Sequence, residues 1–265
     1  MGRCRVVTSV LDLDRHPLDD ATYRARSRAR LEVDGALVVP GLVPASVIDA
    51  IVAEMAPRES EAFFAGSSHN VYLTDPDPSW PAGHAVNRQV DSTKGLLADD
   101  QIPADSALRA IYGDETLRSF LCAVLGIEAV HPYADSLSSI NVHFAPNGRE
   151  LGWHFDNSSF AVTMLLQAPS GGGAFEYVPG ARDSAAGEQG FGIVDAVLDG
   201  EAGADVARLD FAPGDLVLFR GRDALHRVTP TEGDVTRLLV VFAFNDRPGV
   251  RLSSSALATF YGRSS

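Results

Sequence analysis

Two patterns of hydrophobic residues divide the chain into a helical first half and a β-rich second half. After Pro44, the apolar residues recur at the spacing of a helix with one buried face: Val47, Ile48, Ile51, Val52 and Met55. Ser106 and Asp114 are good helix N-caps ahead of further helical spacing that ends at Gly126. Residues 36–39 form a short apolar run between turn residues, which predicts a strand.

From residue 131 onward, the pattern changes to short β-rich runs separated by turns. These runs cover residues 138–144, 160–167, 173–178, 215–219 and 236–244. Many short strands with turns between them are typical of a sandwich or barrel. Residues 180–208 interrupt the runs and predict an inserted surface loop with a short helix. The fold class expected is therefore α+β, with a jelly-roll core behind flanking N-terminal helices.

The length of 265 residues fits one large domain. Residues 1–30 are weakly patterned and are expected to form an N-terminal arm, either mobile or a surface helix. Residues 31–265 are expected to form a single domain. Within it, residues 44–126 would supply helical support and a lid, and residues 131–249 the jelly-roll core.

Composition narrows the function classes. The formal net charge of −13 argues against a nucleic-acid partner, because such binding needs a basic surface. No apolar run reaches the roughly 18 residues of a membrane span. Two cysteines far apart are expected to be free thiols, which favours a reducing, cytoplasmic setting. We expect a monomer or homodimer that acts on a small molecule.

A histidine and an aspartate two residues apart form the strongest local motif. In an extended segment, His154 and Asp156 project from the same face, so together they could bind one cation. The alternative is a surface strand with two polar residues facing water. His226 follows a distant apolar strand and could supply a third ligand, although a single histidine there could also be a packed residue. Two imidazoles and one carboxylate suit non-heme Fe(II), and zinc accepts the same ligands.

Arg237 is a cation at the start of an otherwise apolar strand, residues 236–244. A buried cation without a partner costs several kcal/mol. Arg237 therefore either lies at the solvent end of its strand or binds an anion inside the protein. A guanidinium group matches a carboxylate with two parallel hydrogen bonds.

These motifs occur in one order along residues 133–249, and that segment resembles the Fe(II)- and 2-oxoglutarate-dependent oxygenases. It is most similar to their free-standing amino-acid hydroxylase and radical halogenase group. The resemblance rests on these stretches: Tyr-Ala-Asp-Ser-Leu at 133–137, Ile-Asn-Val-His at 140–143, Gly-Trp-His-Phe-Asp-Asn at 152–157, Phe-Ala-Val-Thr-Met-Leu-Leu-Gln at 160–167, Gly-Gly-Ala-Phe-Glu-Tyr-Val-Pro at 172–179 and Leu-Val-Leu-Phe-Arg-Gly-Arg-Asp-Ala-Leu-His-Arg-Val-Thr-Pro at 216–230.

The resemblance implies a double-stranded β-helix, a cupin-like jelly roll. His154, Asp156 and His226 would bind Fe(II) as the catalytic centre. The co-substrate 2-oxoglutarate would chelate the iron, Arg237 would bind its far carboxylate, and O2 would convert it to succinate and CO2. Halogenating relatives carry a small residue in place of the aspartate. The presence of Asp156 therefore implies a hydroxylase.

Further residues are candidates for the pocket. Asn141, His143 and Thr163 are expected to contact the co-substrate, although His143 could instead be structural and Thr163 simply a β-former. The candidates for substrate contact are Asn157, Asp135, Arg88 and Trp153, of which Trp153 is as well explained by packing. The expected substrate is a free amino acid or a derivative, and the residues around Asn157 and Arg237 argue against a basic one.

Three other functions stay open at this point. The same cofactors could produce desaturation or another oxidative outcome. A jelly-roll protein could keep the ligands and bind a molecule without turnover. A zinc hydrolase could use the same three ligands, but the surroundings of Arg237 and His226 argue against it.

Overall fold

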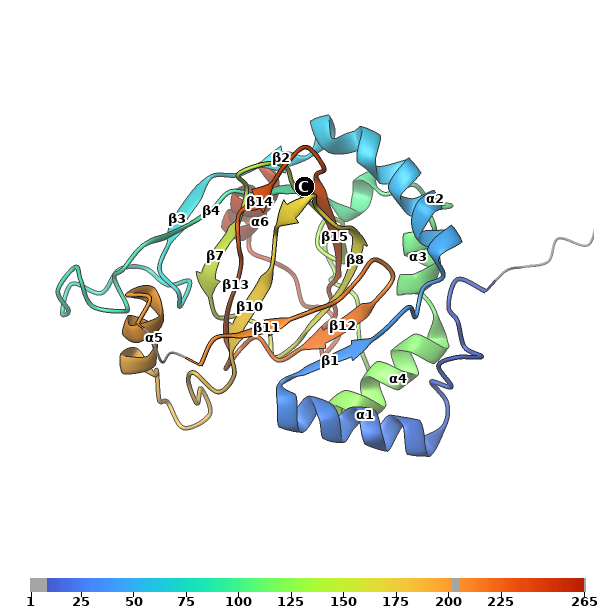
Figure 1. Cartoon of the computed structure of the whole chain (residues 1–265), viewed down its shortest axis with the longest axis horizontal. Coiled ribbons are helices and arrows are strands. Elements are labelled where there is room, and N and C mark those ends of the chain that lie inside the picture. The colour runs from blue at the N-terminus through green and yellow to red at the C-terminus, as the bar shows by residue number, and fades with distance from the viewer. Residues whose placement is uncertain (1–8, 202–204, 265) are drawn as a thin grey trace, which may run out of the picture.

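The computed structural model describes residues 9–201 and 205–264, and two antiparallel sheets face each other in it as a sandwich (Figure 1). The seven-stranded sheet has the order β1 (Ala36–Val39), β12 (Leu216–Phe219), β8 (Ala161–Gln167), β15 (Arg237–Phe242), β6 (Ile140–Ala145), β5 (Gly95–Leu97) and β2 (Phe63–Phe64). The six-stranded sheet has the order β11 (Ala207–Leu209), β10 (Phe175–Val178), β13 (Leu225–Val228), β7 (Leu151–His154), β4 (Val90–Ser92) and β3 (Ser67–His69). A short ribbon pairs β14 (Thr231–Glu232) with β9 (Gly171–Gly172).

Helices cover the outer face of the seven-stranded sheet (Figure 1). They are α1 (Ala21–Asp34), α2 (Ala45–Met55), α3 (Ala107–Tyr112) and α4 (Glu115–Leu125). Two further helices are α5 (Phe191–Leu198) and α6 (Ser254–Tyr261), and two 3-10 turns are η1 (Ala56–Glu61) and η2 (Asp99–Gln101). In α4, the Asp114 side chain caps the first turn, and Gly126 ends the helix with a positive φ of 72°.

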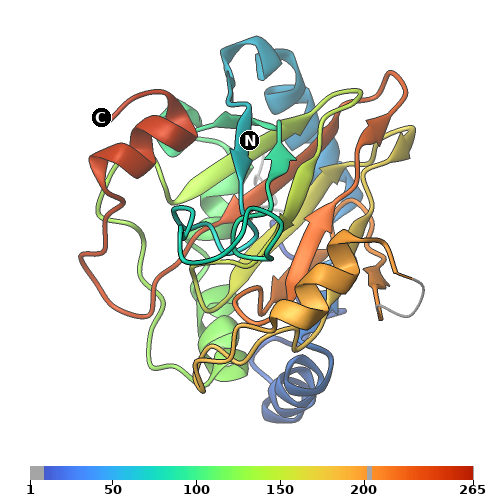
Figure 2. The same cartoon turned by 90° about the vertical axis from the view of Figure 1, so that its left-hand side faces the viewer.

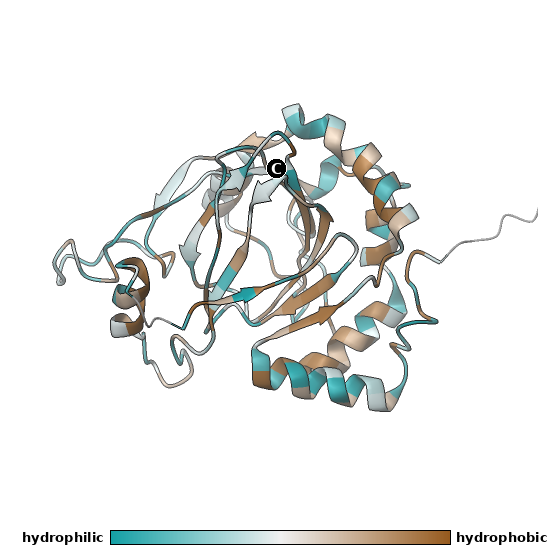
Figure 3. Ribbon diagram, viewed as in Figure 1, coloured by the Kyte–Doolittle hydropathy of each residue, from teal (hydrophilic) through white to brown (hydrophobic). Residues whose placement is uncertain are grey.

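The main core lies between these helices and the sheet. Alternate strand residues face the helices and are fully buried, among them Val142, Phe144 and Val240. They share one hydrophobic cluster with Ile51 of α2 and Phe120 of α4. Each such side chain contributes roughly 1.5–3 kcal/mol relative to exposure. In Figure 3, β1 and β12 of this sheet are coloured as hydrophobic.

The other face of the seven-stranded sheet points into the sandwich. Antiparallel pairing sets Arg237 of β15 opposite Ala145 of β6, and Leu239 opposite His143. Because side chains alternate along a strand, Arg237 and His143 lie on the face opposite the helices. The interior of the sandwich therefore receives the polar residues that the sequence singled out.

A second cluster covers the outside of the six-stranded sheet. Helix α5, beside this sheet in Figure 2, packs through Val194 and Val197 against Trp153 and Phe155. This places the inserted segment on the sheet that carries His154.

The expected fold class, α+β with a jelly-roll core, is confirmed. Within the expected arm, α1 begins at Ala21 and packs against α4. Leu11 and Leu18 of the same segment are each 1% exposed in the main core. The first eight residues of the expected arm lie outside the described residues. In the part of the chain that is described, no helix combines the length and apolar character needed to span a membrane.

Candidate metal centre and its cationic surroundings

Two imidazoles and one carboxylate converge between the sheets. Strands β7 and β13 are hydrogen-bonded neighbours, and their register places His154 directly opposite His226. Asp156 follows β7 by two residues, and its Oδ1 lies 3.7 Å from His154 Nε2 and 3.6 Å from His226 Nε2. The potential ligand atoms of the three side chains all lie within 4.8 Å of one another. The structure thus brings together the three residues predicted to bind one ion.

Backbone carbonyls orient both imidazole rings. His154 Nδ1 lies 2.8 Å from the Gly152 carbonyl oxygen, and His226 Nδ1 lies 2.9 Å from that of Ala224. Since a carbonyl only accepts, each Nδ1 carries the hydrogen, and each Nε2 presents a lone pair toward Asp156. Burial, followed by the nearby His226, holds the pKa of His154 well below 6.5, so this ring is neutral.

The Asp156 carboxylate lacks a donor among the described residues. Its Oδ2 is buried without a hydrogen-bond partner, and its Oδ1 faces lone pairs rather than N–H groups. Such a carboxylate beside two Nε2 lone pairs repels them unless a cation lies between. The donor set and its lack of internal partners therefore fit a divalent metal ion.

A buried arginine, Arg237, also lies on the interior face of the sandwich. Its residue is 6% exposed, and burial lowers its pKa to about 10. Across residues 9–201 and 205–264, no acidic side chain pairs with it. A Cβ at Gly173 would lie 2.9 Å from Arg237 Cδ, so this glycine leaves the room that the arginine occupies. Arg237 is therefore buried rather than placed at the solvent end of its strand.

The sequence reasoning missed Lys94, which also faces this interior. Its ammonium Nζ lies 3.2 Å from His143 Nδ1. Burial lowers the pKa of Lys94 to about 8, Asp156 opposes that shift and Arg237 adds to it. Burial also holds the pKa of His143 well below 6.5, with Lys94 and Arg237 adding to the effect. The available signal was that Lys94 is the only lysine among the 22 basic residues of the chain.

Two of the other candidates are fully engaged within the protein. Asn141 donates to the Ser138 carbonyl at 2.8 Å and accepts from the Tyr261 hydroxyl at 2.7 Å. Asp135 accepts from the backbone N–H groups of Leu137, Ser138 and Leu252. These bonds anchor α6 and the loop before β6, and they use both side chains within the protein.

The remaining candidates lie at different depths. Thr163 of β8 stands opposite Val241 of β15 on the interior face and is partly exposed. Trp153 lies on the outer face under the Arg227 guanidinium, 4.7 Å from the ring centroid, so it packs there. Arg88 is held by Asp195 of α5 and by Asp199, the C-cap of that helix, and Asn157 is exposed. Arg88 therefore ties the loop to α5 rather than reaching the cluster.

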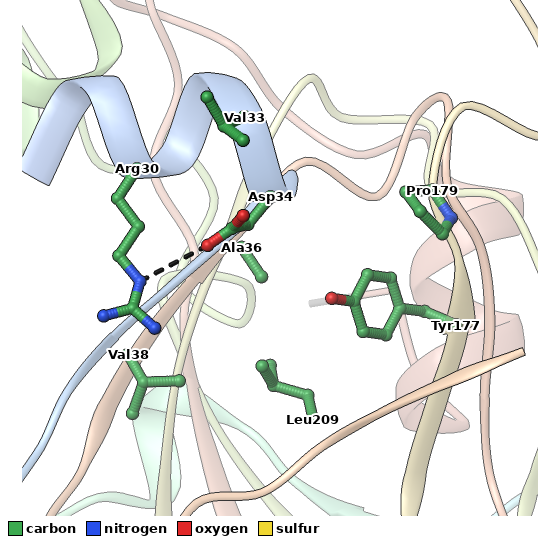
Figure 4. A pocket seen from close by; sticks show the side chains of 8 residues that line it. All are labelled: Arg30, Val33, Asp34, Ala36, Val38, Tyr177, Pro179 and Leu209. Carbon is green, nitrogen blue, oxygen red and sulfur yellow. Dashed lines mark ion pairs between the residues drawn. The ribbon is translucent and has the colours of Figure 1, made fainter.

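A distinct cavity of about 320 Å³ lies at the edge of the sandwich, where α1 meets β1 and β10 (Figure 4). Its walls include Val33, Val38 and Tyr177, together with the paired side chains of Arg30 and Asp34. None of the metal-cluster residues lines it. It is therefore separate from the candidate centre.

Comparisons with known proteins agree with this geometry. The chain is similar in structure to SnoN, described as a non-heme alpha ketoglutarate dependent epimerase from nogalamycin biosynthesis, with 18% identity, a TM-score of 0.55 and coverage of 86% of this chain and 84% of that one. It is also similar to HygX from Streptomyces hygroscopicus, whose structure holds nickel, 2-oxoglutarate and hygromycin B, with 13% identity, a TM-score of 0.57 and coverage of 86% and 89%. A third is an oxidoreductase of the 2OG-Fe(II) oxygenase family from Burkholderia pseudomallei, with 14% identity, a TM-score of 0.50 and coverage of 86% and 93%. No curated protein matches the sequence.

The sequence match is more specific than these likenesses of fold. The family model described as Halogenase D matches residues 86–256, more than half of the chain. The matched segment includes Lys94, the three cluster residues and Arg237. The chain therefore belongs to the Halogenase D family, and its fold is that of the Fe(II)- and 2-oxoglutarate-dependent oxygenases that the sequence resembles.

Proposed function

We propose that this protein is an Fe(II)- and 2-oxoglutarate-dependent dioxygenase that hydroxylates a C–H bond of a small metabolite, a free amino acid or a derivative. One observation carries the proposal: His154, Asp156 and His226 meet between the sheets, and the unpaired Arg237 faces the same interior. A metal site explains the cluster, and an anionic co-substrate explains the arginine.

Each residue has a defined task in this proposal. His154 and His226 would hold Fe(II) through Nε2, with their rings fixed by backbone carbonyls. Asp156 would supply the negative charge, and Arg237 would bind the distal carboxylate of 2-oxoglutarate. The bound iron would activate O2, coupled to conversion of 2-oxoglutarate to succinate and CO2. Three protein ligands leave the positions that the co-substrate and O2 require.

The identity of residue 156 supports hydroxylation over halogenation, despite the name of the family. A halogenase of this type needs a small residue where a halide would bind. Here the Asp156 carboxylate occupies that position, and Gly221 packs directly against it. We therefore expect no chlorine in the product, even with chloride present.

The test is a screen of free amino acids and related metabolites with the Fe(II)-loaded protein. Succinate release and O2 uptake should rise with the right substrate, and the product should gain one oxygen. A loss of two hydrogens would indicate desaturation, and an unchanged mass would indicate epimerisation. Asp156→Ala is the control and should abolish turnover and weaken metal binding. Succinate that never exceeds this control, with or without added metabolite, would favour a binding protein or a zinc hydrolase instead.

A further inference from the structure

The only lysine of the chain faces the interior of the sandwich rather than solvent. Strand β5 pairs with β6 so that Leu96 lies opposite His143. The same register, continued by one residue, places Lys94 opposite Ala145, whose other neighbour is Arg237 of β15. Lys94 and Arg237 thus flank one alanine on the same face of the sheet.

These two cations have little to neutralise them. In the described part of the chain, neither forms an ion pair, and Lys94 has one side-chain hydrogen-bond partner, His143 Nδ1 at 3.2 Å. That partner is a neutral acceptor, because burial holds the pKa of His143 well below 6.5. The nearest acidic influence on Lys94 is Asp156, which the proposed function assigns to the metal. The positive charges of Lys94 and Arg237 are therefore not balanced by a neighbouring carboxylate that is free to pair with them.

A carboxylate between the two cations would balance these charges. Buried charges are stabilised by partners that form charge-assisted hydrogen bonds. In the strand register only the methyl group of Ala145 stands between them, so no bulky side chain separates the two cations. By accepting a hydrogen bond from the Lys94 ammonium, His143 would keep that ammonium directed toward the anion.

We propose that Lys94 and Arg237 together bind the distal carboxylate of 2-oxoglutarate, with His143 positioning the Lys94 ammonium. This inference rests on the proposed function and adds a specificity determinant to it. The site should discriminate strongly between 2-oxo acids with and without a second carboxylate, because only the former engages both cations.

The first test measures the Kd of 2-oxoglutarate by calorimetry, with Mn(II) in place of Fe(II) so that nothing turns over. Lys94→Met should raise this Kd about 10- to 100-fold, the range expected for a lost hydrogen bond to a charged group. Lys94→Arg should recover most of the affinity. The Kd of 2-oxobutyrate, which lacks the distal carboxylate, should change less than about twofold in Lys94→Met.

A matched control removes a cation elsewhere. Arg208 is a surface residue with 64% side-chain exposure, paired with Asp210, and Arg208→Met should leave both Kd values unchanged. The affinity of each variant for Mn(II) alone reports whether its site is still folded.

The second test needs no variant. An acetylating reagent attacks Lys94 as the only lysine, and peptide mass spectrometry measures the fraction modified. Mn(II) with 2-oxoglutarate should protect Lys94 from the reagent, whereas Mn(II) with 2-oxobutyrate should protect it far less.

The outcomes are distinguishable. If wild type binds 2-oxoglutarate but Lys94 is not protected, or if Lys94→Met weakens both 2-oxo acids equally, this assignment is overturned while the proposed function stands. If wild type binds Mn(II) but no 2-oxoglutarate, the proposed function falls and this assignment falls with it.

Discussion

Gly221 allows a sharp test of the proposed metal centre, because a single methyl group there would overlap the proposed ligand Asp156. An added Cβ would overlap Asp156 Oδ2, and it would lie 2.6 Å from Asp156 Cγ and 3.0 Å from His226 Cε1. The φ of Gly221 lies outside the left-handed region, so alanine is not strained by its backbone. The Gly221 carbonyl accepts from the Asp156 N–H at 3.0 Å, which holds the two backbones together. The expected effect of Gly221→Ala is therefore steric.

The size of that effect follows from the distances. An ordinary contact begins at 3.4 Å, so the Asp156 carboxyl carbon must move by at least about 0.8 Å. Metal–ligand distances tolerate only about 0.2 Å. We expect the Kd for Fe(II) or Mn(II) to rise about 10- to 100-fold or more, as for disturbance of groups that orient metal ligands. The free energy of unfolding of the metal-free protein should fall by about 1–3 kcal/mol, typical of overpacking.

The assay is anaerobic calorimetry with Fe(II), repeated with Mn(II), alongside urea unfolding of the metal-free protein. Gly66→Ala is the matched control, because a Cβ at Gly66 would meet nothing within 4 Å. In an Asp156→Gly background, Gly221→Ala should affect metal affinity far less, since the severe overlap with the carboxylate is gone and only the 3.0 Å contact with His226 Cε1 is left. Wild-type metal affinity in Gly221→Ala would refute the placement of Asp156 as a ligand.

Three further predictions concern other residues. Arg237→Met should raise the Kd of 2-oxoglutarate about 100-fold, measured with Mn(II), and leave the Kd of the metal within about twofold; equal loss of both would indicate general damage instead. Burial lowers the pKa of His16 in the folded protein below its unfolded value of 6.5, so its contribution to stability is complete above about pH 6.5 and declines as the pH falls. His16→Gln should therefore reduce the loss of unfolding free energy between pH 7.5 and 5.5 in urea titrations, by at most about 1.4 kcal/mol per pH unit, and an identical pH profile would contradict this. Burial alone would raise the pKa of Asp135, but hydrogen bonds from Ser138 and backbone N–H groups lower it, so Asp135→Asn should cost about 1–3 kcal/mol of stability while the Kd of 2-oxoglutarate stays unchanged.

The sequence predicted the elements whose pattern is strongly apolar and left open an element that is stabilised by other means. The run at 236–244 became β15 and the helix after Pro44 became α2, because each buries a regular stripe of side chains. The segment of α1 was left open as a surface helix or a mobile arm, because the helix buries only Ser27 and Leu31. It is held instead by the Asp20 cap, which accepts from the Tyr23 N–H, and by packing against α4. The hydrophobic periodicity of a helix is a weak signal where capping and packing against neighbouring elements stabilise that helix.

The meeting of His154, Asp156 and His226 could be predicted from the sequence and its resemblance, whereas the residues around them could be predicted only in part. His154 and Asp156 form a local motif, and strand alternation alone places them on one face. Their approach to His226 required the register of β7 against β13, which the resemblance supplied and local pattern could not. Lys94 lies in a loop-rich region, and its neighbours His143 and Arg237 come from two distant strands. Such a residue is found only when sheet register is known.

Whether a polar side chain has a partner within the protein distinguishes structural candidates from ligand-binding candidates better than its position along the chain does. Asn141, Asp135 and Arg88 are polar residues of the matched family segment, and each has its hydrogen bonds or ion pairs satisfied by other parts of the protein. Arg237 is as buried as Asn141, yet in the described residues no carboxylate meets it. A buried guanidinium with no partner is costly to the fold, whereas a satisfied one is neutral or stabilising. Because that cost is relieved when an anion binds, the unpaired cation, rather than the bonded polar side chains, marks where a ligand belongs.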